Sequence, residues 1–229
     1  MTGGAAPPTG SGERYLEERR ERMVRNLIER RGVRDPEVLA AMRSVPRHLF
    51  VEPHLHNQAY SDFALPIGWD QTISQPWVVA RMTELMGVEA DHAVLEVGTG
   101  SGYQTAVLAR LVRWVTSLER IPELALRAIE RMRELGIDNV KIVAFDGSAG
   151  WKQGAPYDRI LVTAGAPVAP QPLLEQLAEG GRLLVPEGDR EQQRLKLYES
   201  RAGKTHCSEA EAVSFVPLLG RHGWAPTPS

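Results

Sequence analysis

The residues of this chain whose types could carry chemistry fall into two groups, one polar and one rich in glycine. The polar group is QTISQPWVVA at residues 71–80, where hydroxyl and amide side chains stand directly before a proline and an apolar run. The second group is LEVGTGSGY at residues 95–103, where an apolar run enters three closely spaced glycines. Such glycines let the backbone turn tightly and let a ligand approach the main chain. Alone, they are also consistent with an ordinary turn between a strand and a helix.

Two acidic residues at the ends of predicted strands favour a ligand site over a bare turn. Glu119 ends the apolar run 114–119, about 20 residues after the glycines, where a carboxylate can accept hydrogen bonds from both hydroxyls of a ribose. Asp146 ends the next run, 140–146, where it can accept from the exocyclic amine of adenine while Gly147 lets the chain pass the ring. An aspartate at such a place is also a common turn former. Together these features predict a site for S-adenosylmethionine, an adenosyl ligand without a diphosphate.

A nucleotide-dependent oxidoreductase is the alternative from another enzyme class. Dinucleotide-binding loops carry the pattern GxGxxG, whereas this chain has GxGxG, with Tyr103 at the position of the expected third glycine. The pattern therefore gives no sign of a pyrophosphate site.

Glu96 lies inside the apolar run that leads into the glycines. An acid there is costly to bury unless its carboxylate is satisfied. It can fix the loop by accepting backbone N–H groups, or it can face the amino group of the ligand. The sequence leaves both interpretations open.

The segments around these motifs predict an α/β fold, a Rossmann-like, doubly wound and mostly parallel sheet. From residue 94 onward, apolar runs alternate with amphipathic segments, as in a sheet covered by helices on both faces. The expected strands are 94–98, 114–119, 140–146, 157–164 and 181–188, and the expected helices are 102–112, 122–135 and 170–179. Residues 194–201 and 211–220 have no helix between them, so we expect them to form an antiparallel C-terminal edge on the same sheet.

Composition limits the class of protein further. Of 229 residues, 42% are hydrophobic and 24% charged, with a formal net charge of −2, so no nucleic-acid or membrane partner is expected. No apolar run reaches the roughly 18 to 20 residues that span a bilayer, and the N-terminus has no signal-peptide pattern. The single cysteine, Cys207, fits a reducing cytoplasm. No metal site is expected, and without an obvious apolar stripe we expect a cytoplasmic monomer.

The motifs, taken in order, resemble those of a known family. VLEVGTGSGYQTAVLA, LER, AFDGSAGW, YDRILVTAGAP and LAEGGRLLVPEG are similar to the motifs of class I S-adenosylmethionine-dependent methyltransferases. QTISQPWVVARMTELM and FVPLLG narrow the resemblance to the protein-L-isoaspartate O-methyltransferase family, over about residues 20–222. This resemblance implies a repair enzyme that transfers a methyl group from S-adenosylmethionine to the free carboxylate of L-isoaspartyl residues in damaged proteins and peptides. The product of the cofactor is S-adenosylhomocysteine.

The resemblance also implies roles for individual residues. Ser74 matches the active-site serine, which orients the substrate carboxylate. That carboxylate, with a pKa of roughly 3.5, is already an anionic nucleophile and needs no general base. Substrate contacts are expected from Thr72, Ser74, Ala166, Val216, Pro217 and Leu218. Cofactor contacts are expected from Gln71, Thr72, Ile73, Glu96, Gly98, Thr99, Gly100, Ser101, Gly102, Glu119, Arg120, Asp146, Gly147 and Leu219.

From residue types alone, QTISQP is also typical of a helix start. Ser74 is then the N-cap and Pro76 lies in the first turn. The two interpretations are compatible, because a helix N-terminus binds anions.

Four regions are expected along the chain. Residues 1–12 are expected to be a disordered tail, and residues 13–77 a helical and irregular extension on the substrate side. Residues 78–189 are the predicted cofactor-binding core, and residues 190–229 the antiparallel strands that complete the sheet and the substrate site. Two further alternatives stay open, namely a methyltransferase of this fold with another substrate and a module that binds S-adenosylmethionine without catalysis.

Overall fold

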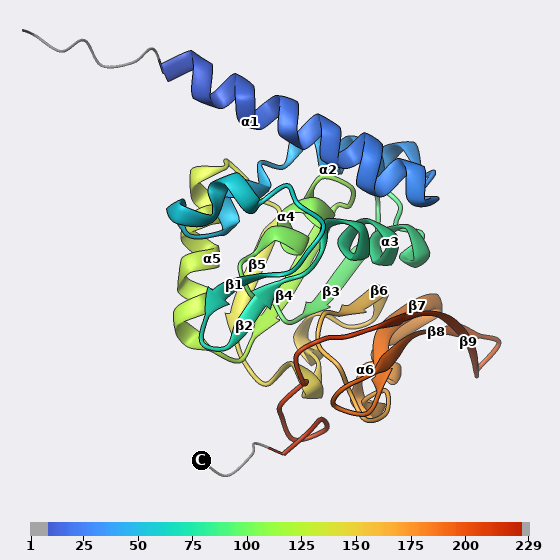
Figure 1. Cartoon of the computed structure of the whole chain (residues 1–229). Helices are drawn as coiled ribbons and strands as arrows, with labels where there is room; N and C mark the ends of the chain where they lie inside the picture. The colour runs from blue at the N-terminus through green and yellow to red at the C-terminus, as the bar shows by residue number, and fades with distance from the viewer. Residues whose placement is uncertain (1–8, 226–229) are drawn as a thin grey trace, which may run out of the picture.

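A seven-stranded sheet forms the centre of the computed structural model, which describes residues 9–225 (Figure 1). The strands are β3 (Ala93–Val97), β4 (Trp114–Glu119), β5 (Val140–Ala144), β6 (Tyr157–Val162), β7 (Leu177–Gly188), β8 (Gln193–Arg201) and β9 (Lys204–Val213). Their order is β5-β4-β3-β6-β7-β8-β9; β3 to β7 pair in parallel, while β8 and β9 are antiparallel. The predicted fold, including its antiparallel C-terminal edge, is confirmed.

Alternate residues of the central strands fill two separate cores, as the pleat of a sheet requires. Leu95 and Ile160 belong to the core on one face, whereas Val94 and Leu161 belong to the core on the other. Both faces are therefore apolar, which explains the near-continuous hydrophobic runs of these strands. The helices of this part are α3 (Pro76–Met86), α4 (Tyr103–Ala109), α5 (Pro122–Glu134) and α6 (Gln171–Leu174).

The N-terminal quarter of the described chain packs onto this core as a helical layer. It contains α1 (Thr9–Met23), the π-helix η1 (Val24–Ile28), α2 (Pro36–Ser44) and the 3-10 helices η2 (Glu29–Arg31), η3 (Arg47–Phe50) and η4 (Pro53–Gln58). Its buried side chains form one cluster with residues of α3, α4 and α5. In Figure 1, α1 lies across the top of the view, far from the C-terminal strands.

A small hairpin joins the helical layer to α3. Its strands are β1 (Leu65–Gly68) and β2 (Gln71–Ile73), and Trp69 and Asp70 between them both have positive φ angles. Two positive φ angles are the conformation that a two-residue hairpin turn requires. The polar stretch QTISQP therefore begins as strand β2, which ends at Ile73 and is separated from α3 by two residues.

Three element boundaries differ from those expected from the sequence. The expected helix 170–179 is wrong beyond residue 174, because Leu177 already pairs with Tyr157 as the start of β7. The expected strand 211–220 is also wrong. β9 runs from residue 204 to residue 213, because a tight turn at Ala202 and Gly203 (φ +52° and +69°) folds it back on β8. Finally, α1 begins at Thr9, within the range 1–12 expected to be disordered, and residues 1–8 lie outside the described part.

The two remaining short helices follow β5. They are η5 (Gly147–Ala149) and η6 (Lys152–Gly154). Across residues 9–225, every helix is too short or too polar to cross a bilayer.

Candidate active site

A cavity lies at the carboxyl ends of the parallel strands, beside the point where the strand order reverses between β3 and β6. This is where open α/β sheets bind ligands, because neighbouring loops there turn in opposite directions. Its walls come from five parts of the chain: β2 with α3, the glycine loop with the start of α4, the loops after β4 and β5, the loop after β6, and a C-terminal segment. The expected contact residues on these walls are Gln71, Thr72, Ile73, Ser74, Gly98, Thr99, Gly100, Ser101, Glu119, Arg120, Gly147, Val216, Pro217, Leu218 and Leu219.

The glycine loop needs a conformation that side chains disfavour. Gly98 has φ +101°, and a Cβ there would collide with Thr163 Oγ1, which donates a 2.6 Å hydrogen bond to the Gly98 carbonyl. Gly102 has φ +88°, and a Cβ there would meet Met132 and Ala128 of α5 at 3.0 and 3.3 Å. Gly102 is not among the residues that line the cavity, and it allows close packing of the loop against α5. Its expected cofactor contact stays a prediction.

Glu119 holds the glycine loop with its carboxylate. Oε2 accepts a 2.8 Å hydrogen bond from the Gly100 N–H, and Oε1 accepts one of 2.9 Å from the Ile121 N–H. The side chain is buried, yet it forms part of the cavity wall. Each carboxylate oxygen has a further lone pair for a hydroxyl in the cavity.

Glu96 lies behind the loop and does not line the cavity. Its Oε2 accepts hydrogen bonds from Thr105 Oγ1 (2.5 Å) and Ser117 Oγ (2.6 Å). A further 2.5 Å bond joins the Ser117 and Thr99 hydroxyls, so Glu96 reaches the loop through side chains. Burial raises the pKa of Glu96 to about 7, although the two hydroxyl bonds act in the opposite direction. No backbone N–H within residues 9–225 donates to Glu96, so the expected direct support of the loop is wrong, while the expected contact with the cofactor stays a prediction.

Asp146 is not among the residues that line the cavity, and its expected cofactor contact stays a prediction. Its Oδ1 accepts from the Ser148 N–H (3.0 Å) and hydroxyl (2.7 Å), and Oδ2 accepts from the Arg221 N–H (2.8 Å). Burial opposes ionisation, but these hydrogen bonds outweigh it and hold the pKa of Asp146 below its usual range. Asp146 therefore ties the C-terminal segment to the loop after β5, while its neighbour Gly147 lines the cavity.

Ser74 is not the N-cap of α3, contrary to the interpretation of QTISQP as a simple helix start. The N-cap is Gln75, with φ −50° and ψ 141°, and its side chain makes no capping bond. A residue before proline is restricted to extended conformations, so the helix can begin only at Pro76. The Ser74 hydroxyl is consequently not used as a cap.

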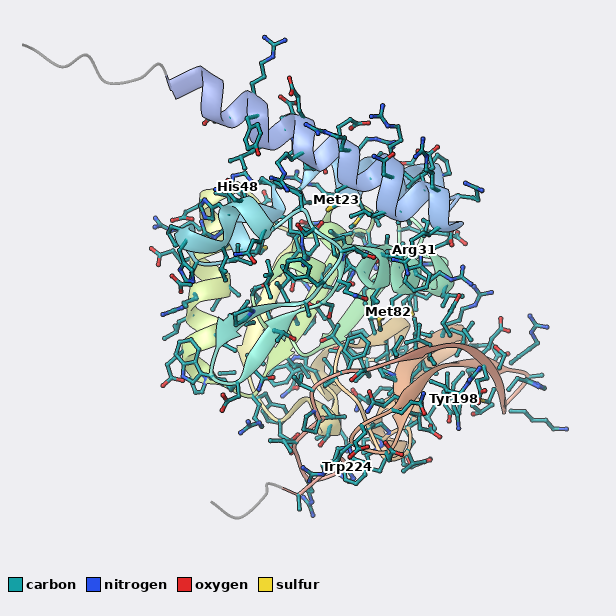
Figure 2. All side chains as sticks on the ribbon, in the orientation of Figure 1. Met23, Arg31, His48, Met82, Tyr198 and Trp224 are labelled. Atoms are coloured by element: carbon teal, nitrogen blue, oxygen red, sulfur yellow. The ribbon has the colours of Figure 1, made fainter. Side chains whose placement is uncertain are left out.

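The C-terminal segment, residues 215–224, closes the cavity by pairing with the loop after β6. The Gly165 N–H donates to the Val216 carbonyl and the Leu218 N–H donates to the Gly165 carbonyl, both at 2.8 Å. Trp224, seen at the lower edge of Figure 2, donates from its indole nitrogen to the same Gly165 carbonyl at 3.1 Å. Ala166 is fully buried and is not among the residues that line the cavity, and its expected substrate contact stays a prediction.

The chain is similar to known proteins over almost the whole of this fold. The profile described as protein-L-isoaspartate(D-aspartate) O-methyltransferase matches residues 18–223. The chain belongs to the protein-L-isoaspartate O-methyltransferase family.

Relatives and solved structures of this family agree over most of the chain. The protein-L-isoaspartate O-methyltransferase 1 of Syntrophobacter fumaroxidans is 53% identical, over 90% of this chain and 96% of its own. That of Methanospirillum hungatei is 52% identical, over 90% and 95%. A solved protein-L-isoaspartate O-methyltransferase has a TM-score of 0.81 at 30% identity, over 89% of this chain and 67% of its own. A putative Plasmodium falciparum member, in complex with S-adenosyl-L-homocysteine, has a TM-score of 0.77 at 27% identity, over 87% and 98%.

An open groove continues from the cavity in this methyltransferase. It shares Thr72, Ser74, Thr163, Phe215 and Val216 with the cavity and extends past Trp77 and residues 212–214. Ser74 thus lies where the cavity and the groove meet. Arg31, labelled in Figure 2, lies at the groove with its guanidinium 4.4 Å from the Trp77 ring and 2.6 Å from Asp62.

Arg47 is a further functional candidate that the sequence motifs do not indicate. Arg47 is fully buried, and its Nη2 donates a 2.7 Å hydrogen bond to the Ser74 carbonyl. The available signal is a single arginine inside the run VPRHLFV, where a charged side chain must be buried or break the apolar pattern.

Proposed function

We propose that this protein transfers a methyl group from S-adenosylmethionine to the free carboxylate of L-isoaspartyl residues in damaged proteins and peptides. Family membership over residues 18–223 carries this assignment. The site supports it through one arrangement: Ser74 lines both the cavity at the strand ends and the groove that continues from it. In the reaction, a carboxylate oxygen forms a bond to the methyl carbon while the bond from that carbon to sulfur breaks. The products are a methyl ester and S-adenosylhomocysteine.

The cavity wall fits an adenosyl cofactor. The glycine loop presents main chain, and Glu119 presents a carboxylate whose remaining lone pairs suit ribose hydroxyls. When bound, S-adenosylmethionine supplies an electrophilic methyl group on a sulfonium. We assign cofactor contacts to the expected residues that line the cavity, which are Gln71, Thr72, Ile73, Gly98, Thr99, Gly100, Ser101, Glu119, Arg120, Gly147 and Leu219.

Ser74 positions the carboxylate nucleophile in this proposal. Its hydroxyl can donate a hydrogen bond to one carboxylate oxygen and leave the other free to attack. No base is needed, because the carboxylate is ionised at neutral pH. The rate gain then comes from holding the oxygen in line with the methyl group and from removing water around it.

The groove accommodates an extended peptide beside Ser74. Its wall at residues 212–216 is the end of β9 and the segment that follows, whose main chain can pair with a substrate main chain. Recognition through the backbone demands little of neighbouring side chains, which suits damage sites in many sequences. We assign substrate contacts to Thr72, Ser74, Val216, Pro217 and Leu218.

Ser74→Ala tests both the function and the role of this residue. We expect the wild type to methylate an isoaspartyl peptide and not its aspartyl isomer. We expect Ser74→Ala to lower kcat/KM for that peptide by roughly 10- to 100-fold with S-adenosylhomocysteine binding retained, because only positioning is lost. Ser208→Ala, on exposed β9 outside both cavity and groove, is the matched control. Cofactor binding without transfer to either peptide would reject the assignment.

We further propose that the protein acts as a cytoplasmic monomer without nucleic-acid or membrane partners. The most exposed large apolar residues, Leu126 and Val168 at 67% and 58%, lie on separate parts of the fold and suggest no shared interface. We also propose the expected division of the chain, with residues 13–77 as an extension on the substrate side, residues 78–189 as the cofactor-binding core and residues 190–229 as the part that completes the sheet and the substrate site. The lining of the groove by Arg31, Ala64 and residues 212–216 supports this division. Light scattering should give the mass of one chain.

A further inference from the structure

Arg47 is a buried cation without a matching anion. Its side chain has 0% exposure, and it forms none of the ion pairs between described residues. Nε donates to the Ala59 carbonyl and Nη2 to the Ser74 carbonyl, both at 2.7 Å, while Nη1 has no hydrogen-bond partner among the described residues. The guanidinium also lies 4.8 Å from the centre of the Tyr103 ring.

This arrangement leaves a positive charge uncancelled inside the protein. Burial lowers the pKa of Arg47 to about 10, which still leaves the guanidinium protonated at neutral pH. Its two acceptors are neutral peptide carbonyls, so they satisfy hydrogen bonds without cancelling the charge. An unpaired buried charge is unfavourable for folding, and such costs are concentrated at functional sites.

The position of Arg47 connects this charge with the substrate side. Ser74 and Gln75 both line the groove, whereas Arg47 lines neither groove nor cavity and so lies behind them. In a trans peptide the C=O and N–H point in opposite directions. Arg47 holds the Ser74 carbonyl, so the N–H of Gln75, at the start of the eleven-residue helix α3, points away from Arg47.

We propose that Arg47 is a positioning residue for the isoaspartyl carboxylate, acting through the Ser74–Gln75 peptide. It fixes the main chain of Ser74, directs the Gln75 N–H toward the groove and attracts the substrate anion from behind. Because the guanidinium never touches the attacking oxygen, the carboxylate keeps its nucleophilicity. A direct ion pair would bind the anion more tightly and slow its attack. This inference rests on the proposed function, since it concerns the anion that the reaction consumes.

Arg47→Met tests the role by removing the charge while keeping a long apolar side chain. We expect kcat/KM for an isoaspartyl peptide to fall by roughly 30- to 100-fold, mainly through KM, with the affinity for S-adenosylhomocysteine changed less than about threefold. Arg47→Lys keeps the charge and can still reach a carbonyl, so it should restore part of the loss. Met23→Ala truncates another side chain of the same core without a bond to Ser74, and it controls for general destabilisation.

A neutral analogue separates positioning of an anion from simple support of the fold. The isoaspartyl peptide and its α-carboxamide form are compared as inhibitors of methylation of a second isoaspartyl peptide. We expect the preference for the carboxylate to fall by about tenfold in Arg47→Met and to be unchanged in Met23→Ala.

Three results would overturn the inference, and they are distinguishable from failure of the proposed function. An unchanged preference for the carboxylate in a folded Arg47→Met would leave Arg47 with structural support alone. Equal losses of affinity for the peptide and for S-adenosylhomocysteine in Arg47→Met would also indicate that Arg47 only supports the fold. If Arg47→Met does not fold, the same comparison is made with Arg47→Gln, which also removes the charge, and an unchanged preference for the carboxylate in that variant would count against positioning. A wild type that methylates no isoaspartyl peptide would instead reject the function itself.

Discussion

Two nearby buried glutamates, Glu96 and Glu119, accept hydrogen bonds from different kinds of donor. Glu119 receives backbone N–H groups from Gly100 and Ile121, which suits a carboxylate that faces a ligand. Glu96 receives only hydroxyl donors, and its Oε1 has no partner within residues 9–225. Its burial raises the pKa of Glu96 to about 7, so the carboxyl group is partly protonated near neutral pH. The network from Glu96 through Ser117 to Thr99 stiffens the loop from behind, and Glu119 completes it from the front.

Glu96→Gln should change how stability depends on pH. The carboxyl has an ordinary pKa of 4.5 and a folded pKa of about 7, so folding favours its protonated form. Below the lower value Glu96 costs nothing, and as pH rises toward 7 the unfolded chain ionises first and the folded state loses stability. The neutral amide avoids this loss, so the advantage of Glu96→Gln in unfolding free energy should grow by up to about 3 kcal/mol between these pH values.

Urea unfolding at several pH values measures this difference. Glu17→Gln, on an exposed position of α1, is the control and should show no such trend. A pH-independent difference between Glu96→Gln and wild type would contradict the raised pKa.

At the scale of elements, the segment after β9 does more than end the sheet. It pairs with Gly165, contributes Val216 to Leu219 to the cavity wall and is tied to Asp146 through the Arg221 N–H. Gly220 makes this approach possible, since a Cβ there would overlap Asp146 Oδ1 and come within 2.6 Å of Ser148 Oγ. The cavity therefore depends on close packing of two loops whose hydrogen-bonded residues are 74 and 75 positions apart in the chain.

Gly220→Ala should loosen this closure. The added methyl group must displace the segment from Asp146, and overpacking of this kind typically costs about 1–3 kcal/mol. We expect a roughly 5- to 100-fold weaker affinity for S-adenosylhomocysteine by calorimetry, with the sheet intact by circular dichroism. Gly12→Ala, where a Cβ meets nothing within 4 Å, is the control. Unchanged affinity would show that the segment does not shape the cofactor site.

At the scale of the whole molecule, the active site is a property of the assembled fold. The hairpin before α3, the glycine loop, the strand ends of β4 and β5 and the C-terminal segment contribute walls to one cavity. The helical layer contributes Arg31 to the wall of the groove, and its Arg47 donates a hydrogen bond to the Ser74 carbonyl. A ligand that bridges these parts must favour the folded state over the unfolded one.

S-adenosylhomocysteine should therefore stabilise the protein against heat. At 100 times its Kd, a ligand specific for the native state adds about 2.7 kcal/mol. For a chain of 229 residues this corresponds to a rise in Tm of roughly 5–10 °C. NAD at the same concentration is the control and should leave Tm unchanged, because the loop lacks the third glycine of a pyrophosphate site. Stabilisation by NAD and not by S-adenosylhomocysteine would contradict the cofactor assignment.

The sequence by itself determined that the chain forms a mostly parallel sheet, which motifs follow its strands, and to which family the chain belongs. Apolar periodicity, the three glycines and Glu119 are local signals, because strands, tight turns and strand ends are dictated by neighbouring residues. Only the tertiary structure decided where Glu96 and Asp146 point, that β9 ends before residue 214, and that Arg47 lies behind Ser74. These outcomes depend on partners 21 to 75 positions away in the chain, and a local pattern carries no information about which distant group will satisfy a buried polar side chain.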